Sequence, residues 1–71
     1  MNEKELLILF GRNLCAERNR SNLSQEGLGE LINISSNQIG KIERGVANPK
    51  LTTIVAILDA LDVEFNDLLR K

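Results

Sequence analysis

The stretch Leu23–Gly45, LSQEGLGELINISSNQIGKIERG, contains the same helix-start signal twice. Ser24 follows Leu23, and Ser35 follows Ile34. Serine is a favoured N-cap because its hydroxyl accepts a hydrogen bond from an amide of the first helical turn. An apolar residue just before the cap can pack against that turn. We therefore expect two short helices, one starting after Ser24 and one after Ser35.

The connection between these two helices is short. Because only Asn33 and Ile34 precede Ser35, the turn needs a residue with positive φ, and Asn tolerates that conformation. Gly29 stands midway along the first helix, where two backbones can approach closely, and Gly45 is suited to end the second helix. Such a pair forms a helix-turn-helix, here about residues 24–45. The apolar residues expected to anchor it are Leu28, Leu31, Ile32, Ile34, Ile39 and Ile42.

The flanking sequence predicts three more helices. The first is capped by Asn2 with Glu5 in the capping-box position, and it ends near residues 19–22. Pro49 precedes the apolar helix Leu51–Leu61, and a short helix follows at about residues 64–69. No stretch alternates with a period of two, so we expect an all-α, compact five-helix fold forming a single domain over residues 1–71. The residues expected to face the core from these helices are Leu6, Phe10, Leu14, Leu51, Ile54, Val55, Leu58 and Leu61.

Composition argues against several functional classes. The chain has 71 residues, no histidine and a single cysteine, Cys15, so no internal disulfide, metal-ligand cluster or nucleophile–base pair can be named. We therefore expect neither an enzyme nor a cofactor or small-molecule ligand. The N-terminus lacks the features of a signal peptide, and no apolar run approaches the roughly 20 residues that span a membrane. The expected location is the cytoplasm, with no membrane contact.

The segments LSQEGLGELINISSNQIGKIERG and NPKLTTIVAILDALDV resemble the lambda-repressor/Cro-like family of transcription regulators, also called the xenobiotic-response-element family. The resemblance covers the chain from Phe10 to Leu69. It implies a five-helix domain whose third helix enters the major groove of double-stranded DNA. Restriction–modification controller proteins and phage-type repressors share this length. The sequence departs from the family pattern in having Asn33 and Asp62 in place of glycine, Gly29 in place of alanine, and Glu17 in place of an apolar residue.

Base contacts are expected from the outer face of the helix that follows Ser35. Asparagine can form two hydrogen bonds with adenine, lysine can bind guanine O6 and N7, and serine accepts several partners. The predicted base-contacting residues, which the resemblance also places there, are Ser36, Asn37 and Lys41.

Other side chains are expected to hold the DNA backbone, a task that carries no direct sequence information. Gln25 begins a helix, where free amides favour a phosphate, and the resemblance gives it a backbone contact. Ser24 and Ser35 serve equally well as helix caps alone. The predicted backbone-contacting residues are Ser24, Gln25, Ser35, Gln38, Arg44 and Lys50.

Glu43 lies near the C-terminus of its helix, where the helix dipole disfavours a carboxylate. The resemblance implies a partly buried salt bridge between Arg18 and Glu43, with a structural role.

The net charge of the chain is −1, yet its charges are unevenly distributed. Residues 11–50 hold six basic and four acidic side chains, whereas residues 51–71 hold two basic and four acidic ones. Because the local distribution sets the field at a binding surface, residues 11–50 can attract DNA in an acidic chain.

Apolar residues crowd the last nine positions, and we expect a C-terminal helix, about residues 63–70, to join two copies in a homodimer. The predicted interface residues are Val63, Phe65, Leu68 and Leu69. Two copies would bind a pseudo-palindromic operator. The alternative function is an antitoxin or another protein-interaction module with the same fold.

Overall fold

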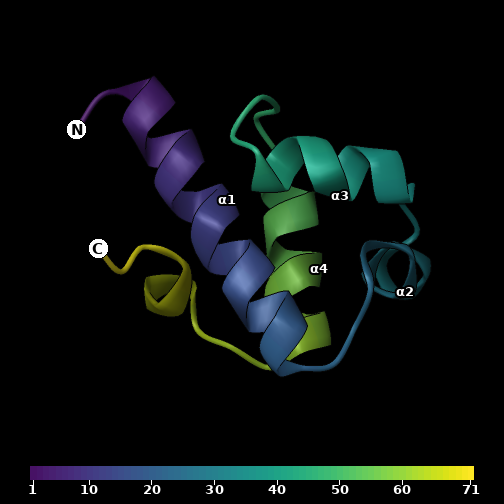
Figure 1. The fold of residues 1–71 in the computed structure, drawn as a ribbon. Coiled ribbons are helices and arrows are strands. Elements are labelled where there is room, and N and C mark those ends of the chain that lie inside the picture. The colour runs from purple at the N-terminus through teal and green to yellow at the C-terminus, as the bar shows by residue number, and fades with distance from the viewer.

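The computed structural model describes all residues from Met1 to Lys71. It contains four α-helices and one short 3₁₀ helix, with no strand: α1 Glu3–Arg20, α2 Gln25–Ile32, α3 Ser36–Glu43, α4 Leu51–Leu61 and η1 Phe65–Leu68. Figure 1 shows α2 and α3 at one end of the molecule, α4 behind α1, and η1 beside α1. No helix combines the length and the apolar character needed to cross a bilayer.

The all-α prediction is confirmed, but the prediction of five α-helices is wrong. The last element is a 3₁₀ helix of four residues. It closes with the i→i+3 type of bond, from the Leu69 amide to the Asn66 carbonyl, at 3.1 Å. Such a short segment forms a single turn, and single turns commonly adopt 3₁₀ geometry.

The predicted helix starts are confirmed. The Asn2 side chain accepts from the Glu5 amide, and the Glu5 carboxylate accepts from the Asn2 amide. The Ser24 hydroxyl accepts from the Gly27 amide at 2.9 Å, and the Ser35 hydroxyl accepts from the Gln38 amide at 3.1 Å.

All four α-helices end with one arrangement. After each helix one residue adopts the left-handed conformation, and the next amide bonds to the carbonyl five residues before it, as in a Schellman motif. The left-handed residues are Asn22, Asn33, Gly45 and Asp62. The amide–carbonyl pairs are Leu23–Arg18, Ile34–Gly29, Val46–Lys41 and Val63–Leu58. Asparagine and aspartate adopt this conformation more readily than other non-glycine residues, so Asn33 and Asp62 fulfil the role that glycine has in the family pattern.

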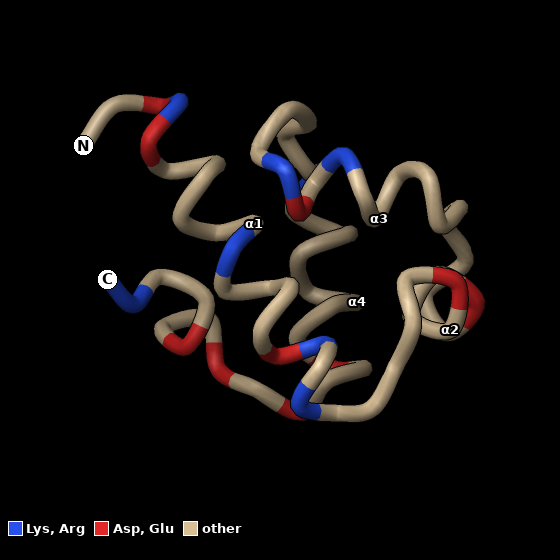
Figure 2. Tube along the Cα trace, in the orientation of Figure 1, with Lys and Arg blue, Asp and Glu red and all other residues tan.

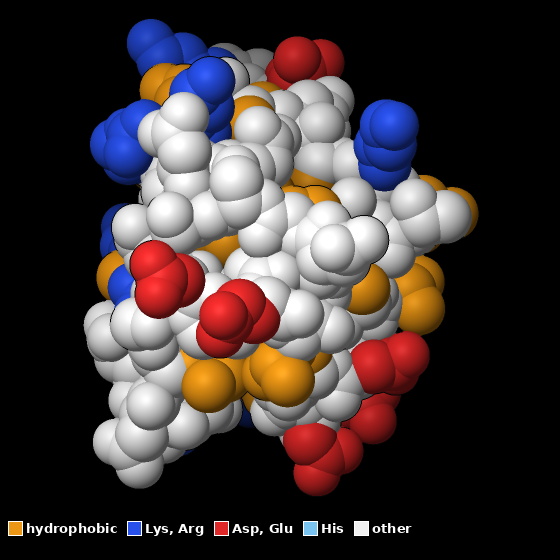
Figure 3. Space-filling view, turned by 90° about the vertical axis from the view of Figure 1, so that its right-hand side faces the viewer, with side chains coloured by type: hydrophobic (Ala, Val, Ile, Leu, Met, Phe, Trp, Pro, Cys, Tyr) orange, Lys and Arg blue, Asp and Glu red, His pale blue; other side chains and the backbone are white.

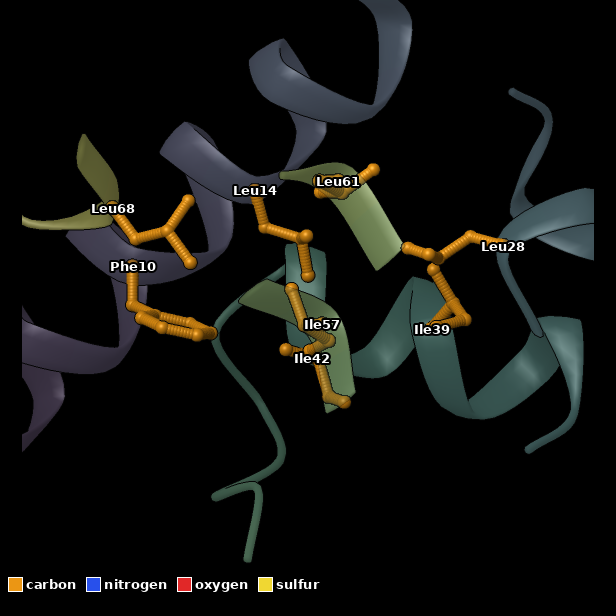
Figure 4. Packing of buried hydrophobic residues seen from close by; sticks show 8 residues of the cluster. All are labelled: Phe10, Leu14, Leu28, Ile39, Ile42, Ile57, Leu61 and Leu68. Atoms are coloured by element: carbon orange, nitrogen blue, oxygen red, sulfur yellow. The ribbon is translucent and has the colours of Figure 1, made fainter. Parts of the chain in front are cut away.

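The core lies where α1, α3, α4 and η1 meet, with Leu28 of α2 closing one side (Figure 4). It consists of eight buried side chains, Phe10, Leu14, Leu28, Ile39, Ile42, Ile57, Leu61 and Leu68. Gly29 allows α2 to approach the turn before α3, because a Cβ there would lie only 2.4 Å from the Ile34 carbonyl oxygen.

Four residues predicted to face the core are exposed instead. Leu31 is 62% exposed because α2 packs through Leu28 and Ile32 on one side only. Val55 lies off the stripe of α4 formed by Ile54, Ile57 and Leu61, and Leu51 stands at the start of that helix. Leu6 is exposed because the first turns of α1 project beyond the other helices in Figure 1.

Candidate nucleic-acid interface

Helix α3 presents a polar face to solvent. Ile39 and Ile42 are almost completely buried and fix the inner side of this eight-residue helix. Ser36, Asn37 and Lys41 are all exposed. None of these three side chains forms a hydrogen bond or salt bridge within the chain, so their polar groups are available to a ligand.

The capping serines keep a free donor. Ser24 and Ser35 accept an amide hydrogen bond through their hydroxyl oxygens. A hydroxyl has one donor in addition to its acceptor lone pairs. A helix cap and a hydrogen bond to a phosphate oxygen are therefore compatible at both residues.

A shallow groove of about 290 Å³ runs between α3 and the loop that leads into α4. The Lys50 side chain forms no cap on α4, so the first amides of that helix have no side-chain acceptor. Free amides at a helix N-terminus favour an anion. The groove is lined by Ile34, Gln38, Ile42, Asn48, Pro49, Lys50 and Thr53.

A buried ionic network joins α1 to α3. Arg18 donates from Nε to Glu43 Oε2 at 2.6 Å and from Nη2 to Glu43 Oε1 at 3.1 Å. Its Nη1 also donates to the Leu23 carbonyl at 2.8 Å. Arg18 is only 8% exposed, and no buried polar side-chain atom in the chain lacks a partner. The pair thus fixes the C-terminal end of α3 relative to α1 and to the start of α2.

The charge state of this network follows from its hydrogen bonds. Burial alone would raise the pKa of Glu43, but the hydrogen bonds from Arg18 and Gln25 and the Arg18 charge outweigh it, so the pKa lies below its usual value. The hydrogen bond to Glu43 raises the pKa of Arg18 despite desolvation. Both groups are therefore charged at neutral pH and neutralise each other beside the polar face of α3.

Gln25 has a partner that the sequence did not indicate. Its Nε2 donates to Glu43 Oε1 at 3.1 Å, so the carboxamide is held between α2 and the end of α3. One N–H of that amide remains for another acceptor. No local sequence pattern pointed to this bond, because the two residues are 18 positions apart.

Basic side chains without a carboxylate partner gather on α3 and the loop after it. The tube view shows basic segments near the end of α3 and just after it, and only acidic ones on α2 (Figure 2). Lys41, Arg44 and Lys50 are exposed and belong to none of the three salt bridges. In the space-filling view most visible Lys and Arg side chains lie in the upper half of the face, and most acidic ones lie lower (Figure 3).

Acidic side chains limit this surface on the α2 side. Glu26 and Glu30 are exposed and line a second shallow hollow together with Ser35 and Ser36. Carboxylates repel phosphates, so the charges favour an approach of DNA over Lys41, Arg44 and Lys50 rather than over α2. Glu17, which departs from the family pattern, pairs with Arg20 at 2.8 Å.

The residues predicted at a dimer interface fall into two groups. Leu68 is fully buried in the core of its own chain, so its assignment to an interface is wrong. Asn13 holds this segment against α1 by donating to the carbonyls of Leu68 and Arg70. Val63 and Leu69 are partly buried against the same core, whereas Phe65 is 45% exposed.

No group of His, Cys, Asp and Glu side chains in the chain is arranged to hold a metal ion.

A protein-family model and known relatives match most of this chain. The helix-turn-helix family model matches residues 16–68. The control protein C.SmaI of Serratia marcescens is 35% identical over 71 residues, which is all of this chain and 81% of that protein. The restriction-modification controller protein C.AhdI of Aeromonas hydrophila has a TM-score of 0.82 and 37% identity, covering 87% of this chain and 94% of that one.

A third comparison concerns the fold alone. The clp gene regulator ClgR of Corynebacterium glutamicum has a TM-score of 0.85 at 22% identity, covering 90% of this chain and 68% of that one.

The region that the family model matches, residues 16–68, includes α2, α3 and α4 in full. The chain therefore belongs to the helix-turn-helix family of DNA-binding transcriptional regulators.

Proposed function

We propose that this chain is a controller of restriction–modification genes that binds, as a homodimer in the cytoplasm, to a pseudo-palindromic operator. The observation that carries the proposal is the outer face of α3, where Asn37 and Lys41 are exposed and unpaired while Ile39 and Ile42 anchor the helix. Similarity to control proteins over the whole chain supports the gene class.

In this proposal α3 lies in the major groove. Asn37 forms paired hydrogen bonds with an adenine, Lys41 binds the O6 and N7 acceptors of a guanine, and Ser36 adds a contact near the start of the helix. The positive charges of Lys41, Arg44 and Lys50 attract DNA toward α3, because none of the three side chains forms a salt bridge with a carboxylate.

Contacts with the DNA backbone lie on both sides of the polar face of α3. Gln25 and Arg44 hold one phosphate region beside the end of α3. Lys50, with the free amides of α4 and the unpaired Gln38 side chain, holds another across the groove. The hydroxyl donors of Ser24 and Ser35 complete the set.

The size of the chain supports a dimer. Its dimensions are 31 × 21 × 20 Å, and it contains one α3. Half-sites read by successive major grooves lie about 34–36 Å apart, so a second copy is needed to occupy both. Of the apolar C-terminal residues, Phe65 is exposed, and Val63 and Leu69 are partly exposed, so these three form the proposed contact.

A binding-site selection from random duplex DNA tests the proposal. Purified protein should enrich two inverted half-sites whose centres are about 10 base pairs apart. A single unpaired half-site would contradict the dimer but leave α3 as the binding element. No enrichment over the starting pool would contradict sequence-specific binding and favour the protein-interaction alternative.

A further inference from the structure

Gly40 is a glycine inside the short helix α3, where alanine would stabilise the helix more. The backbone at Gly40 requires no glycine, because its φ is not positive. The reason for the glycine must therefore lie in the space around it. Gly40 is buried even though it has no side chain, so other side chains cover it.

Two long side chains occupy that space. A methyl group built on Gly40 would lie 3.1 Å from Nη1 of Arg44, and 3.5 Å and 3.6 Å from Oε1 and Nε2 of Gln25. The guanidinium and the carboxamide, from different elements, thus converge on one point above the α3 backbone.

A hydrogen bond orients the Gln25 donor, whereas the Arg44 donor has no salt-bridge partner. Glu43 accepts one N–H of Gln25, which orients the carboxamide, and Arg18 neutralises Glu43. Arg44 forms no salt bridge, so its charge is not consumed by the nearby carboxylate. A guanidinium beside an amide donor matches the oxygen atoms of a phosphate group.

We propose that Gly40 is a positioning residue for DNA binding: its missing side chain lets the Arg44 guanidinium lie against α3 beside Gln25, so that the two side chains hold the same backbone phosphate. This inference rests on the proposed function and deepens it. Gly40 contacts no base and no phosphate, because the two side chains cover it. Its effect should therefore be on affinity for all sequences alike and not on base preference.

Gly40→Ala separates this role from a role in folding. Alanine favours the helix, and the one atom that the methyl would crowd is the end of the flexible Arg44 side chain, so the urea midpoint should stay equal or rise. DNA affinity should nevertheless fall roughly tenfold, as expected when a charge-assisted hydrogen bond is lost. The dependence of binding on salt should become shallower by about one phosphate contact, with the selected base sequence unchanged.

Val55→Ala is the matched control. Val55 is an exposed residue inside α4 and belongs to none of the proposed DNA contacts, and alanine has the higher helix propensity. It should keep or raise the urea midpoint without the loss in affinity. Equal affinity of the Gly40→Ala and wild-type proteins for the selected operator would overturn the inference.

A second set of variants shows whether the methyl acts through the two side chains. In a Gln25→Ala/Arg44→Ala background, adding Gly40→Ala should cause no further loss of affinity. A loss of the same size in that background would mean that the methyl meets the DNA itself, which also overturns the inference. If the wild-type protein selected no DNA sequence, the proposed function would fail instead, so the two failures are distinguishable.

Discussion

The Arg18 guanidinium and the Glu43 carboxylate form two hydrogen bonds, at 2.6 Å and 3.1 Å, across the interface of α1 and α3. Both side chains are largely buried, with 10% and 6% of their surface exposed. Removing one partner would leave a buried charge unpaired. We expect Arg18→Met or Glu43→Gln alone to lower the free energy of unfolding by about 3–5 kcal/mol.

A double-mutant cycle in urea measures this coupling. The double variant should lose less than the two single variants added together, because neither charge remains unpaired in it. Strictly additive losses would show that the pair does not interact in solution.

The same pair predicts a pH dependence. The pKa of Glu43 is lower in the folded chain than its ordinary value of 4.5. A depressed pKa contributes stability that is fully present above the unfolded-state pKa and is lost as the pH falls through the folded one. The urea midpoint should therefore drop below about pH 4.5 more steeply for the wild type than for Glu43→Gln, since the variant has no carboxylate at that position. Identical slopes for the two proteins would argue against this assignment.

Lys41 is expected to determine a base. Lys41→Ala should lower the affinity for the selected operator by roughly 1–3 kcal/mol and relax the preference at one position in each half-site. The Lys41 side chain is exposed and belongs to no salt bridge, so the urea midpoint should change little. A binding-site selection with the variant is the measurement. An unchanged preference at every position would remove Lys41 from the base-contacting set.

Lys50 is expected to act on the DNA backbone alone. Lys50→Ala should weaken binding to specific and non-specific DNA to a similar degree, and the logarithmic salt dependence should become shallower by about one. Lys4 at the start of α1 is an exposed lysine on a segment distant in sequence from α3, and Lys4→Ala serves as the control. A changed base preference, or an unchanged salt dependence, would contradict the assignment of Lys50.

Patterns among residues close together in the sequence correctly predicted the helix caps and the turn between α2 and α3. The caps at Ser24 and Ser35 and the turn at Asn33 each depend on residues a few positions apart, and the structure has all of them. Burial was predicted less well, because periodicity identifies an apolar face without showing how much of it neighbours cover. Leu31 and Leu51 were misassigned for this reason.

Contacts between distant segments could not be derived from spacing. The hydrogen bond from Gln25 to Glu43 and the two bonds from Asn13 to the C-terminal segment depend on how the helices pack. The same holds for Gly11, where a Cβ would lie 2.3 Å from the Ile42 carbonyl oxygen, so α1 and α3 can approach only with glycine there. The error at Leu68 has the same origin, because the apolar character of a terminal turn does not show whether it docks on its own chain or on another.

The C-terminal segment allows the dimer to be tested separately from the fold. Phe65 is 45% exposed, so Phe65→Glu should leave the core intact while placing a charge in the proposed contact between two copies. We expect a folded monomer in analytical ultracentrifugation at micromolar concentration, with weaker and non-cooperative binding to the paired half-sites.

Leu31→Glu is the matched control for the dimer contact, because Leu31 is also an exposed apolar residue but lies on α2, and this variant should remain dimeric. Leu68→Ala should behave differently from both, since it opens a cavity in the core and should cost about 2–5 kcal/mol of stability. A wild-type chain that stays monomeric alone and on its operator, or a Phe65→Glu variant that dimerises as the wild type does, would contradict the proposed interface.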